Sequence, residues 1–476
     1  MRNKLQQAGL IAFGLIAGIF ISLNFSANAE KQAAAPLPVE ELRTFAEVFG
    51  AIKAGYVEPV EDKKLITHAI SGMLSGLDPH SAYLDADAFK DLQVNTQGEF
   101  GGLGIEVGME DGFVKVISPI EDTPAFRAGI KAGDFIVKLD DTQVKGMTLT
   151  DAVKRMRGKP KTQITLTVLR KGEAKPLLIT LTREVIKVQS VKSKLVEPGY
   201  VYLRLTQFQE DSATKMVEHL NKLYKQGPVK GIVLDLRNDP GGLLHGAVGV
   251  AAAFLPPQVV VVSTDGRTDD AKRKYIASPE DYLRGTRIDF LKDLPPGVKT
   301  VPMVVLVNGG SASASEIVAG ALQDHKRAII MGTQTFGKAS VQSILPLPGG
   351  TAIKLTTARY YTPNGRSIQA KGILPDIVSE DPASNGSSMA HLREADLERH
   401  LANDKEKELE KEKEKDAAAK PVKPAKPAPK GGKPLKEDIL DEESMKPPVE
   451  PASKNDYQFN QALNLLKALQ ILQPPK

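Results

Sequence analysis

The sequence lacks cysteine altogether in its 476 residues. This absence excludes disulfide bonds, a thiolate nucleophile and metal sites built from cysteine sulfur. The sequence also has little excess of either charge sign. Its 63 Lys and Arg residues nearly balance its 58 Asp and Glu residues, which gives a net charge of +5. Nothing in this balance favours a nucleic-acid partner. Hydrophobic residues still make up 41% of the chain, enough for two or three domains with sizeable cores.

An apolar run near the amino terminus spans about residues 10–23. Arg2 and Lys4 precede it, and residues 27–29, Ala-Asn-Ala, follow with the small-x-small pattern of a signal peptidase site. Residues 1–29 are therefore predicted to be a signal peptide, and the periplasm is the expected destination. The alternative is an uncleaved inner-membrane anchor that faces the periplasm. Because no cysteine follows the run, a lipoprotein anchor is not expected.

A turn rich in small residues lies at residues 308–316, Asn-Gly-Gly-Ser-Ala-Ser-Ala-Ser-Glu. The hydrophobic run 301–307 before it predicts a buried strand, and residues 317–322 after it predict an apolar helix. Its glycines allow a tight turn, and the free amides at the helix start can hold negative charge beside Ser313. Ser313 is therefore a candidate nucleophile, although simple helix capping also explains such serines.

A second stretch, residues 336–342, reads Phe-Gly-Lys-Ala-Ser-Val-Gln and follows a strand-like run at residues 327–331. Its lysine, Lys338, is thereby expected near a strand end of an α/β core, where ligands tend to bind. A lysine beside a serine can act as the general base if burial keeps its amine neutral, because desolvation disfavours the ammonium form.

Together the two stretches resemble the carboxyl-terminal processing (tail-specific) protease family, and the resemblance runs from about Val39 to about Asp381. That family places its serine in a SASASE turn and its lysine 25 residues later in an FGK motif, and here 338 − 313 = 25. The resemblance implies a serine endopeptidase that works through an acyl-enzyme. In it Ser313 attacks the peptide carbonyl, Lys338 removes the serine proton and Gln342 orients the lysine. No metal or cofactor is expected.

Residues 235–242, Asp-Leu-Arg-Asn-Asp-Pro-Gly-Gly, resemble the family's DLRxNPGG segment. The resemblance implies that an amide of Gly241 or Gly242 joins that of Ala314 to form the oxyanion hole. Asp239 stands where the family commonly has asparagine. Because an extra negative charge close to an oxyanion is unfavourable, we expect the side chain of Asp239 to point away.

A region that predicts mostly short strands opens with a glycine-rich loop. Its residues 124–136 resemble the signature of PDZ domains, which add a peptide as an extra strand and hold the terminal carboxylate on loop amides. Protein or peptide substrates are therefore expected to bind through their carboxyl termini. The order of the glycines matches no nucleotide-binding motif. The candidate peptide-binding residues are Gly101, Gly102, Leu103, Gly104 and Ile105.

Arg170 ends the predicted strand 164–169. It lies about where related enzymes carry an arginine that couples the PDZ domain to the core, so the resemblance implies a gating role. A solvated arginine in a turn is the alternative.

The predicted fold class is α/β: a catalytic α/β core with an inserted, mainly-β PDZ domain, a helical amino-terminal segment and a partly disordered, partly helical tail. Residues 263–291 are polar enough to predict a surface loop. Leucines at helical spacing in residues 457–472 need a surface to pack against: the core, a second subunit or an adaptor. The expected limits are 30–96 for the helical segment, 97–184 for the PDZ domain, 185–385 for the core and 386–476 for the Lys/Pro-rich tail.

Two other readings stay open. One is a non-catalytic PDZ protein that binds peptides or acts as a chaperone. The other is a Ser-His hydrolase that uses His245 or His325 as the base. His80, in a segment that resembles the family's LDPHSxYL motif, is expected to be structural.

Overall fold

The computed structural model describes residues 37–120, 122–173, 175–187, 189–285, 288–380, 393–405 and 450–472. The expected signal peptide with its apolar run and residues 406–449 of the Lys/Pro-rich tail lie outside these ranges. In the ranges described, no helix combines the length and apolar character needed to cross a membrane. The chain divides into two compact units, one that ends at Ala69 and one that begins at Ile70.

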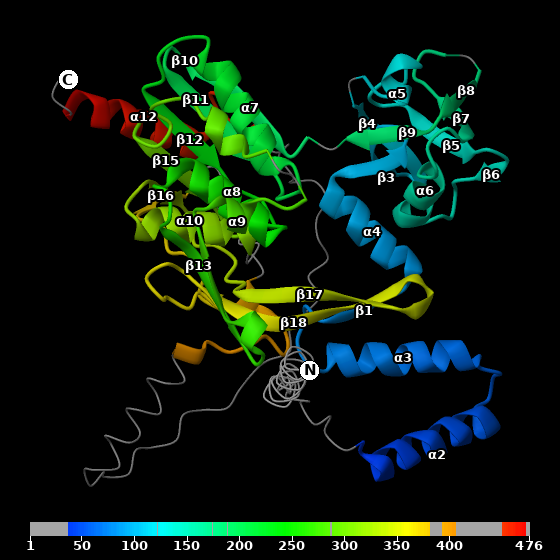
Figure 1. The fold of residues 1–476 in the computed structure, drawn as a ribbon. Helices are drawn as coiled ribbons and strands as arrows, with labels where there is room; N and C mark the ends of the chain where they lie inside the picture. Colours follow the sequence, from blue (N-terminus) through cyan, green and yellow to red (C-terminus); the bar gives the residue numbers. More distant parts are fainter. Residues whose placement is uncertain are drawn as a thin grey trace, which may run out of the picture. The chain divides into compact units, whose positions relative to one another are not determined.

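The first unit contains α2 (Val39–Gly55) and most of α3 (Asp62–Ser75) (Figure 1). Acidic residues in the first turn of α2 and Lys53 in its last turn suit the helix dipole. Lys53 also forms an ion pair with Asp62, which joins the end of α2 to the start of α3.

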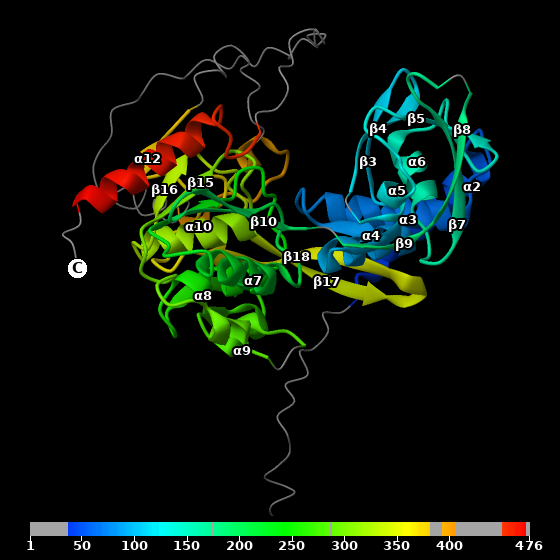
Figure 2. The same cartoon turned by 90° about the horizontal axis from the view of Figure 1, so that it is seen from above.

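A PDZ-like sheet lies in the second unit, with strand order β3-β4-β5-β7-β8 and β6 paired to β5 (Figure 2). Alternate residues of β7 are buried, as in a strand with one face in the core, and β7 contains the strand predicted at residues 164–169. The elements are β3 (Ile105–Glu110), β4 (Phe113–Pro119), α5 (Pro124–Arg127), β5 (Phe135–Leu139), β6 (Thr142–Gln143), α6 (Leu149–Met156), β7 (Gln163–Leu169) and β8 (Leu177–Thr182).

Two strands connect this sheet to the rest of the unit. They are β2 (Glu99–Gly102) and β9 (Glu184–Lys187), which pair antiparallel. Before β2, helix α4 (Ala86–Gln97) is capped by the Asp85 carboxylate at its start and ends at Gly98, whose φ of 73° suits glycine.

The α/β core is built on a six-stranded sheet. Its order is β10-β11-β12-β15-β16-β19, and every neighbouring pair after β10-β11 is parallel. Central strands of such a sheet are covered on both faces, which explains the continuous hydrophobic run at residues 303–307. The strands are β10 (Val191–Glu197), β11 (Tyr200–Leu205), β12 (Gly231–Asp235), β15 (Met303–Val307), β16 (Ile329–Gly332) and β19 (Ile377–Val378).

Alternate residues of β12 enter two different hydrophobic clusters. Ile232 and Leu234 pack with α7 (Ser212–Tyr224), α8 (Leu244–Phe254) and α10 (Ala314–Asp324) on one face. Val233 packs with α12 (Tyr457–Leu472) on the other face (Figure 2).

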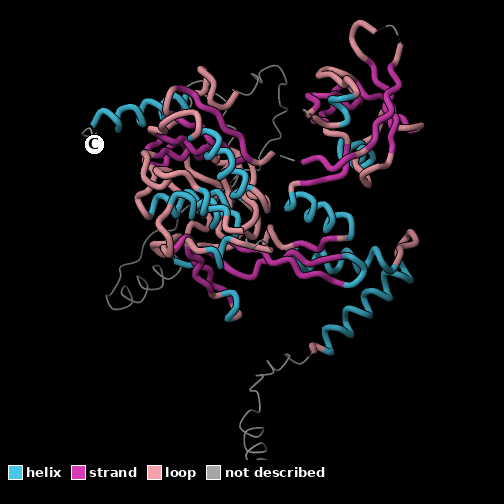
Figure 3. The backbone as a smooth tube through the Cα atoms, turned by 45° about the horizontal axis from the view of Figure 1, so that its top comes forward, coloured by secondary structure: helices cyan, strands magenta, loops and turns pink. Residues whose placement is uncertain are grey.

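A second, antiparallel sheet carries the segment that follows Lys338. Strands β17 and β18 form a long hairpin (Figure 3). The elements here are β1 (Ala82–Leu84), β13 (Val260–Gly266), β14 (Arg273–Ile276), α9 (Pro279–Tyr282), β17 (Ser340–Leu347) and β18 (Thr351–Tyr361). Short 3-10 turns lie at Asp269–Ala271, Phe290–Asp293, Pro348–Gly350 and Glu394–Asp396.

The leucine-rich terminal helix packs against the core of its own chain. Phe459, Leu463 and Leu466 of α12 are buried, and the ring of Phe459 meets that of Tyr202 edge-on at 5.5 Å. At the start of the helix, the Asp456 carboxylate accepts hydrogen bonds from Arg237, one of them at 2.7 Å. The helix therefore covers a sheet face within a single chain. Of the three surfaces expected for it, the core, a second subunit or an adaptor, it packs on the core.

We predict that Leu466→Ala destabilises the core and Leu472→Ala does not. Leu466 is 0% exposed and Leu472 is 79% exposed, so only the first change leaves a cavity, worth about 2–5 kcal/mol. Urea unfolding followed by circular dichroism measures both. Equal midpoints for the two variants would contradict the packing of α12 on the sheet.

Candidate active site

Ser313 lies on the predicted strand-to-helix turn, directly before α10. Its φ of 54° is a conformation that residues with a side chain rarely adopt. The neighbouring serines are buried and used for structure, because Ser311 donates to the carbonyl of Leu236 at 2.7 Å and Ser315 to that of Asp239 at 2.9 Å. In the described chain the Ser313 hydroxyl donates no hydrogen bond; its side chain faces the Glu316 amide in a capping box at the start of α10. The structure thus distinguishes Ser313 from the other serines of the turn.

One buried carboxylate joins the serine turn to the lysine loop. Glu316 Oε2 accepts the amide hydrogens of Ser313 (2.9 Å) and Lys338 (3.0 Å). Its Oε1 accepts from the amide of Gly337 (2.7 Å) and the hydroxyl of Thr335 (2.5 Å). Glu316 is 0% exposed. Burial raises its pKa to about 7, and the four donated hydrogen bonds oppose that rise.

A tyrosine hydroxyl reinforces this connection from the carbonyl side. Tyr360 Oη donates to the carbonyl of Lys338 at 2.6 Å and lies 3.1 Å from that of Ser313. Sequence reasoning missed both groups. Glu316 carries a signal, since it stands three residues after Ser313 in the S-x-x-E pattern of a capping box. Tyr360 carries none.

Lys338 lies in a fixed and largely desolvated loop. Burial, followed by the charge of Lys354, lowers the pKa of its amine, while Glu394, Glu316 and Asp78 raise it. The lowered pKa is the condition that a neutral general base requires. In the described ranges, no hydrogen bond joins Lys338 Nζ to Ser313 Oγ. Glu316 and Tyr360 hold the two backbones near each other, whereas the described structure does not join the two side chains directly.

Residues beyond position 392 also fix the lysine loop through a chain of hydrogen bonds. Gln369 accepts the amide hydrogen of Ala339 at 2.9 Å and donates to the buried carboxylate of Glu394, also at 2.9 Å. The same carboxylate contacts His80 Nε2 at 2.8 Å. His80 therefore supports the Lys338 loop through two intermediates, in agreement with its expected structural role.

The side chain of Gln342 bonds to neighbouring hydroxyl groups rather than to Lys338, the residue that it was expected to orient. Its amide nitrogen donates to Ser340 Oγ (2.9 Å) and Thr356 Oγ1 (3.1 Å), and Thr356 donates to Asp78. No hydrogen bond to Lys338 is present among the described residues. The lysine-orienting role of Gln342 stays a prediction.

The loop before α8 meets the serine turn at Gly241. A Cβ there would lie 2.8 Å from the amide nitrogen of Ala314 and 2.9 Å from Ser313 Cβ, and φ is 97°, so only glycine fits. The Gly241 amide, however, donates to Asp239 Oδ1 at 2.8 Å. The amides of Gly242 and Ala314 have no acceptor in the described chain. Of the three expected oxyanion donors, these two are available.

The side chain of Asp239 turns back onto its own loop, where its Oδ1 accepts the hydrogen bond of the Gly241 amide at 2.8 Å. Its expected orientation away from the oxyanion stays a prediction. Asp239 is 0% exposed, and its Oδ2 has no hydrogen-bond partner among the described groups.

The expected peptide-binding residues lie partly in strand β2 and partly along a cavity. Gly101 and Gly102 end β2, and the carbonyl of Gly101 accepts from Gly158 at 3.0 Å. Gly102, Leu103, Gly104 and Ile105 line a cavity of about 70 Å³ together with Val153 and Met156 of α6. The guanidinium of Arg157 lies 4.6 Å from the Phe100 ring centroid beside this cavity.

Arg170 makes its described contacts inside the PDZ-like domain. Its guanidinium binds both carboxylate oxygens of Asp134 at 2.8 Å and the carbonyl of Gly129 at 2.8 Å. The pair holds the pKa of Asp134 below its usual value against the effect of burial. A gating role for Arg170 would have to exchange or extend these contacts, and it stays a prediction.

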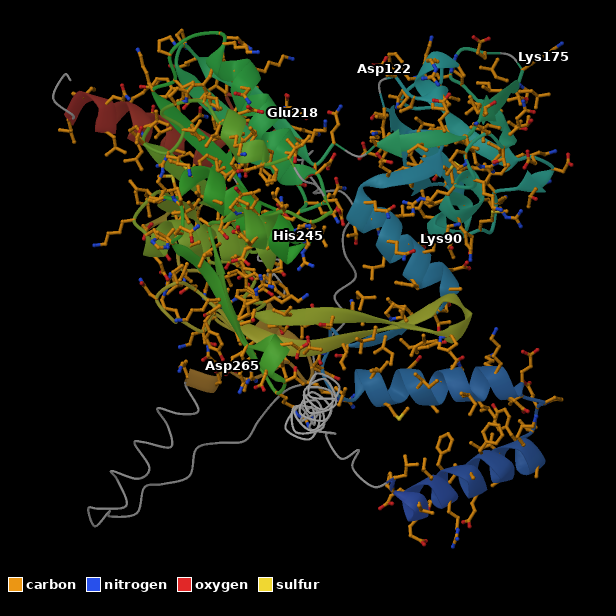
Figure 4. All side chains as sticks on the ribbon, viewed as in Figure 1. Lys90, Asp122, Lys175, Glu218, His245 and Asp265 are labelled. Carbon is orange, nitrogen blue, oxygen red and sulfur yellow. The ribbon has the colours of Figure 1, made fainter. Side chains whose placement is uncertain are left out.

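Neither histidine of the Ser-His reading contacts Ser313. His325 follows the last residue of α10, about 18 Å from Ser313 at 1.5 Å per residue, and its Nε2 contacts the carbonyl of Val260. His245 lies near the start of α8 (Figure 4), where its buried Nε2 has no partner in the described part of the chain. The position of His325 excludes it as a base for Ser313.

Three family models match the chain. Peptidase family S41 matches residues 199–379, the PDZ domain matches residues 101–181, and the activating protease CtpB N-terminal domain matches residues 21–88. The carboxy-terminal-processing protease of Bartonella bacilliformis is 48% identical over 372 residues, which cover 77% of this chain and 82% of that protein.

A second relative is the carboxy-terminal processing protease CtpA of Bacillus subtilis, 33% identical over 76% of this chain and 74% of its own length. Among solved structures, the photosystem II D1 C-terminal processing protease is 31% identical, with a TM-score of 0.40 over 71% of this chain and 86% of its own.

We predict that Glu316→Gln lowers the free energy of unfolding by about 2–6 kcal/mol. The new amide nitrogen cannot accept hydrogen bonds, so two buried donors lose their partner at about 1–3 kcal/mol each. The control is Glu218→Gln on the exposed face of α7 (Figure 4), which should change stability by less than about 0.5 kcal/mol. Chemical denaturation compares them, and equal stabilities would contradict the four-donor site.

Proposed function

The chain belongs to the carboxy-terminal processing proteases, and from that serine peptidase identity we propose that Ser313 and Lys338 form its catalytic dyad. The observation that carries the proposal is the pair of clamps, Glu316 and Tyr360, that binds the backbones of both residues. Ser313 attacks the scissile carbonyl, and Lys338 takes its proton and returns it to the leaving amine. The acyl-enzyme is then hydrolysed by water.

The tetrahedral intermediate is held by the amides of Ala314 and Gly242 in this proposal. Both lie where the start of α10 meets the Gly241 turn, and neither has another acceptor in the described ranges. Such preorganised donors lower the barrier because their dipoles already point at the developing charge. Gln342 would reach Lys338 by releasing Ser340 or Thr356.

Substrates bind through their carboxyl termini at the PDZ domain, and the cavity beside Leu103 and Gly104 is the proposed position of the terminal side chain. Arg170 is the proposed coupling residue between that domain and the core. The apolar run and the Ala-Asn-Ala site support export, with the periplasm as the proposed compartment and a membrane anchor at residues 10–23 as the alternative.

The domain limits predicted from the sequence remain our proposal, with one addition: residues 393–405 and 450–472 contribute to the core. Asp404 accepts from Tyr361 and Ser367 on the core side. An adaptor or a second subunit that uses α12 would bind its outer residues, such as Ile471, which is 84% exposed.

Ser313→Ala and Lys338→Met should each abolish proteolysis of unfolded casein, and the double variant should be scarcely worse, because the dyad acts as a unit. Methionine keeps the buried chain of the lysine but has no proton acceptor. Lys215→Ala, on the exposed face of α7, is the control with unchanged turnover. Activity that survives in Lys338→Met would assign the base elsewhere.

On the acid side, turnover should rise with pH. The amine of Lys338 acts only when neutral, and burial lowers its pKa, so protonation as the pH falls removes the base. Initial rates between pH 5 and about pH 9 test this. A rate already maximal near about pH 5 would be incompatible with a lysine base.

Val153→Glu should slow cleavage of substrates that end in apolar residues more than substrates that end in Asp-Asp, because it places a charge in the PDZ cavity. Gln163→Glu adds the same charge at an exposed position of β7 and serves as the control. The test is the ratio of initial rates on two chains that differ only at the terminus. An unchanged ratio in Val153→Glu would show that this cavity does not read the terminus.

A further inference from the structure

A buried carboxyl group lies beside the proposed oxyanion hole and has no part in the dyad. Asp239 Oδ1 accepts the hydrogen bond of the Gly241 amide at 2.8 Å. The main-chain carbonyl of Asp239 accepts from the amide of Ala312 at 3.0 Å and from the hydroxyl of Ser315 at 2.9 Å. One residue therefore connects the Gly241 turn to both sides of the nucleophile.

The second oxygen of this carboxyl group is isolated. Oδ2 is buried and has no hydrogen-bond partner among the described residues. Burying an ionised carboxylate with one oxygen unbonded costs far more than burying the neutral acid. Burial accordingly raises the pKa of Asp239 to about 7, far above its ordinary value, although the Gly241 amide and the Ser315 hydroxyl oppose the rise.

The charged groups around Asp239 do not remove this effect. Arg204 on β11 lowers the pKa of Asp239, and Asp235 on β12 raises it. These two side chains already pair with each other at 3.1 Å, and Arg237 also binds Asp235 at 2.7 Å. The start of α10 contributes Ala312 and Ser315, which are uncharged. The positive charge near Asp239 is thus engaged elsewhere.

The position of Asp239 makes its charge matter for catalysis. A Cβ added to Gly241 would lie 2.8 Å from the Ala314 amide nitrogen and 2.9 Å from Ser313 Cβ, so the Gly241 turn approaches both closely. The carboxyl group that holds Gly241 is therefore close to the place where the oxyanion develops. A neutral acid there fixes the turn without opposing the oxyanion, whereas a carboxylate repels it across a medium of low dielectric constant.

We propose that Asp239 is a positioning residue that holds the oxyanion turn in its neutral, protonated form, and that loss of its proton weakens catalysis at alkaline pH. The proposal rests on the proposed dyad. It gives the enzyme two opposing requirements, a neutral lysine and a neutral aspartic acid. The pH dependence of kcat/KM should then be bell-shaped, and its two limbs describe the coupled pair of groups.

Asp239→Asn separates the two requirements. The amide oxygen still accepts from Gly241, but the side chain no longer ionises. We expect kcat/KM of the full chain on unfolded casein to fall about tenfold above the optimum in the unmodified enzyme. In the Asn variant the rate should rise to a plateau instead. An alkaline fall of the same size in Asp239→Asn overturns the proposal.

Asp239→Ala tests the positioning itself. Without the acceptor, the Gly241 turn is free to move, so kcat should fall while KM changes little and the alkaline limb disappears. A purely structural role would lower the melting temperature of both variants and leave the alkaline limb in place. Full kcat in Asp239→Ala would also overturn the proposal.

Failure of the inference is distinguishable from failure of the dyad. Ser313→Ala is run beside each variant, and activity in Ser313→Ala would refute the proposed function, whatever Asp239 does. If Ser313→Ala is inactive and Asp239→Asn retains the alkaline fall, only the role of Asp239 is refuted.

Discussion

The active site depends on one buried carboxylate, Glu316. It connects two segments that are far apart in the sequence. A backbone amide of the serine turn and one of the lysine loop both donate to the same oxygen of Glu316. Such a group is expensive to bury and is retained only when its hydrogen bonds are complete. Here each oxygen accepts two hydrogen bonds, which leaves no lone pair for a proton. Geometry thus favours the ionised form against the effect of burial.

Much of the fold could be predicted because its signals are local. The apolar run at residues 303–307 and the leucine spacing at 457–472 follow the periods of a buried strand and an amphipathic helix, and both elements form at these positions. The polar composition of residues 263–291 was misleading. This region contains β14 and α9, because the buried Asp281 pairs with Arg273 and accepts the Ile276 amide. Such a partnership has no local signature.

The site shows the same limit. Ser313 and Lys338 stand in motifs, and the clamps at Glu316 and Tyr360 bring their backbones together. The contacts of Gln342, Asp239 and Glu394 depend on tertiary packing. A motif states which residue type stands at a position. It does not say whether a carboxamide faces the lysine or a neighbouring threonine, since that is decided by competition among nearby donors and acceptors.

Asp239 and Glu316 show how hydrogen-bond donors divide two buried carboxyl groups between two roles. Burial raises the pKa of each to about 7. Glu316 receives four donors and is suited to remain a carboxylate that binds backbone amides. Among the described residues, the Asp239 carboxyl group accepts one hydrogen bond within 3.5 Å, from the Gly241 amide, and its Oδ2 has no partner, so that oxygen has room for a proton. In our proposal, the same desolvation therefore supports a fixed charge behind the proposed dyad and a neutral acid beside the proposed oxyanion hole, where a second charge would oppose the reaction.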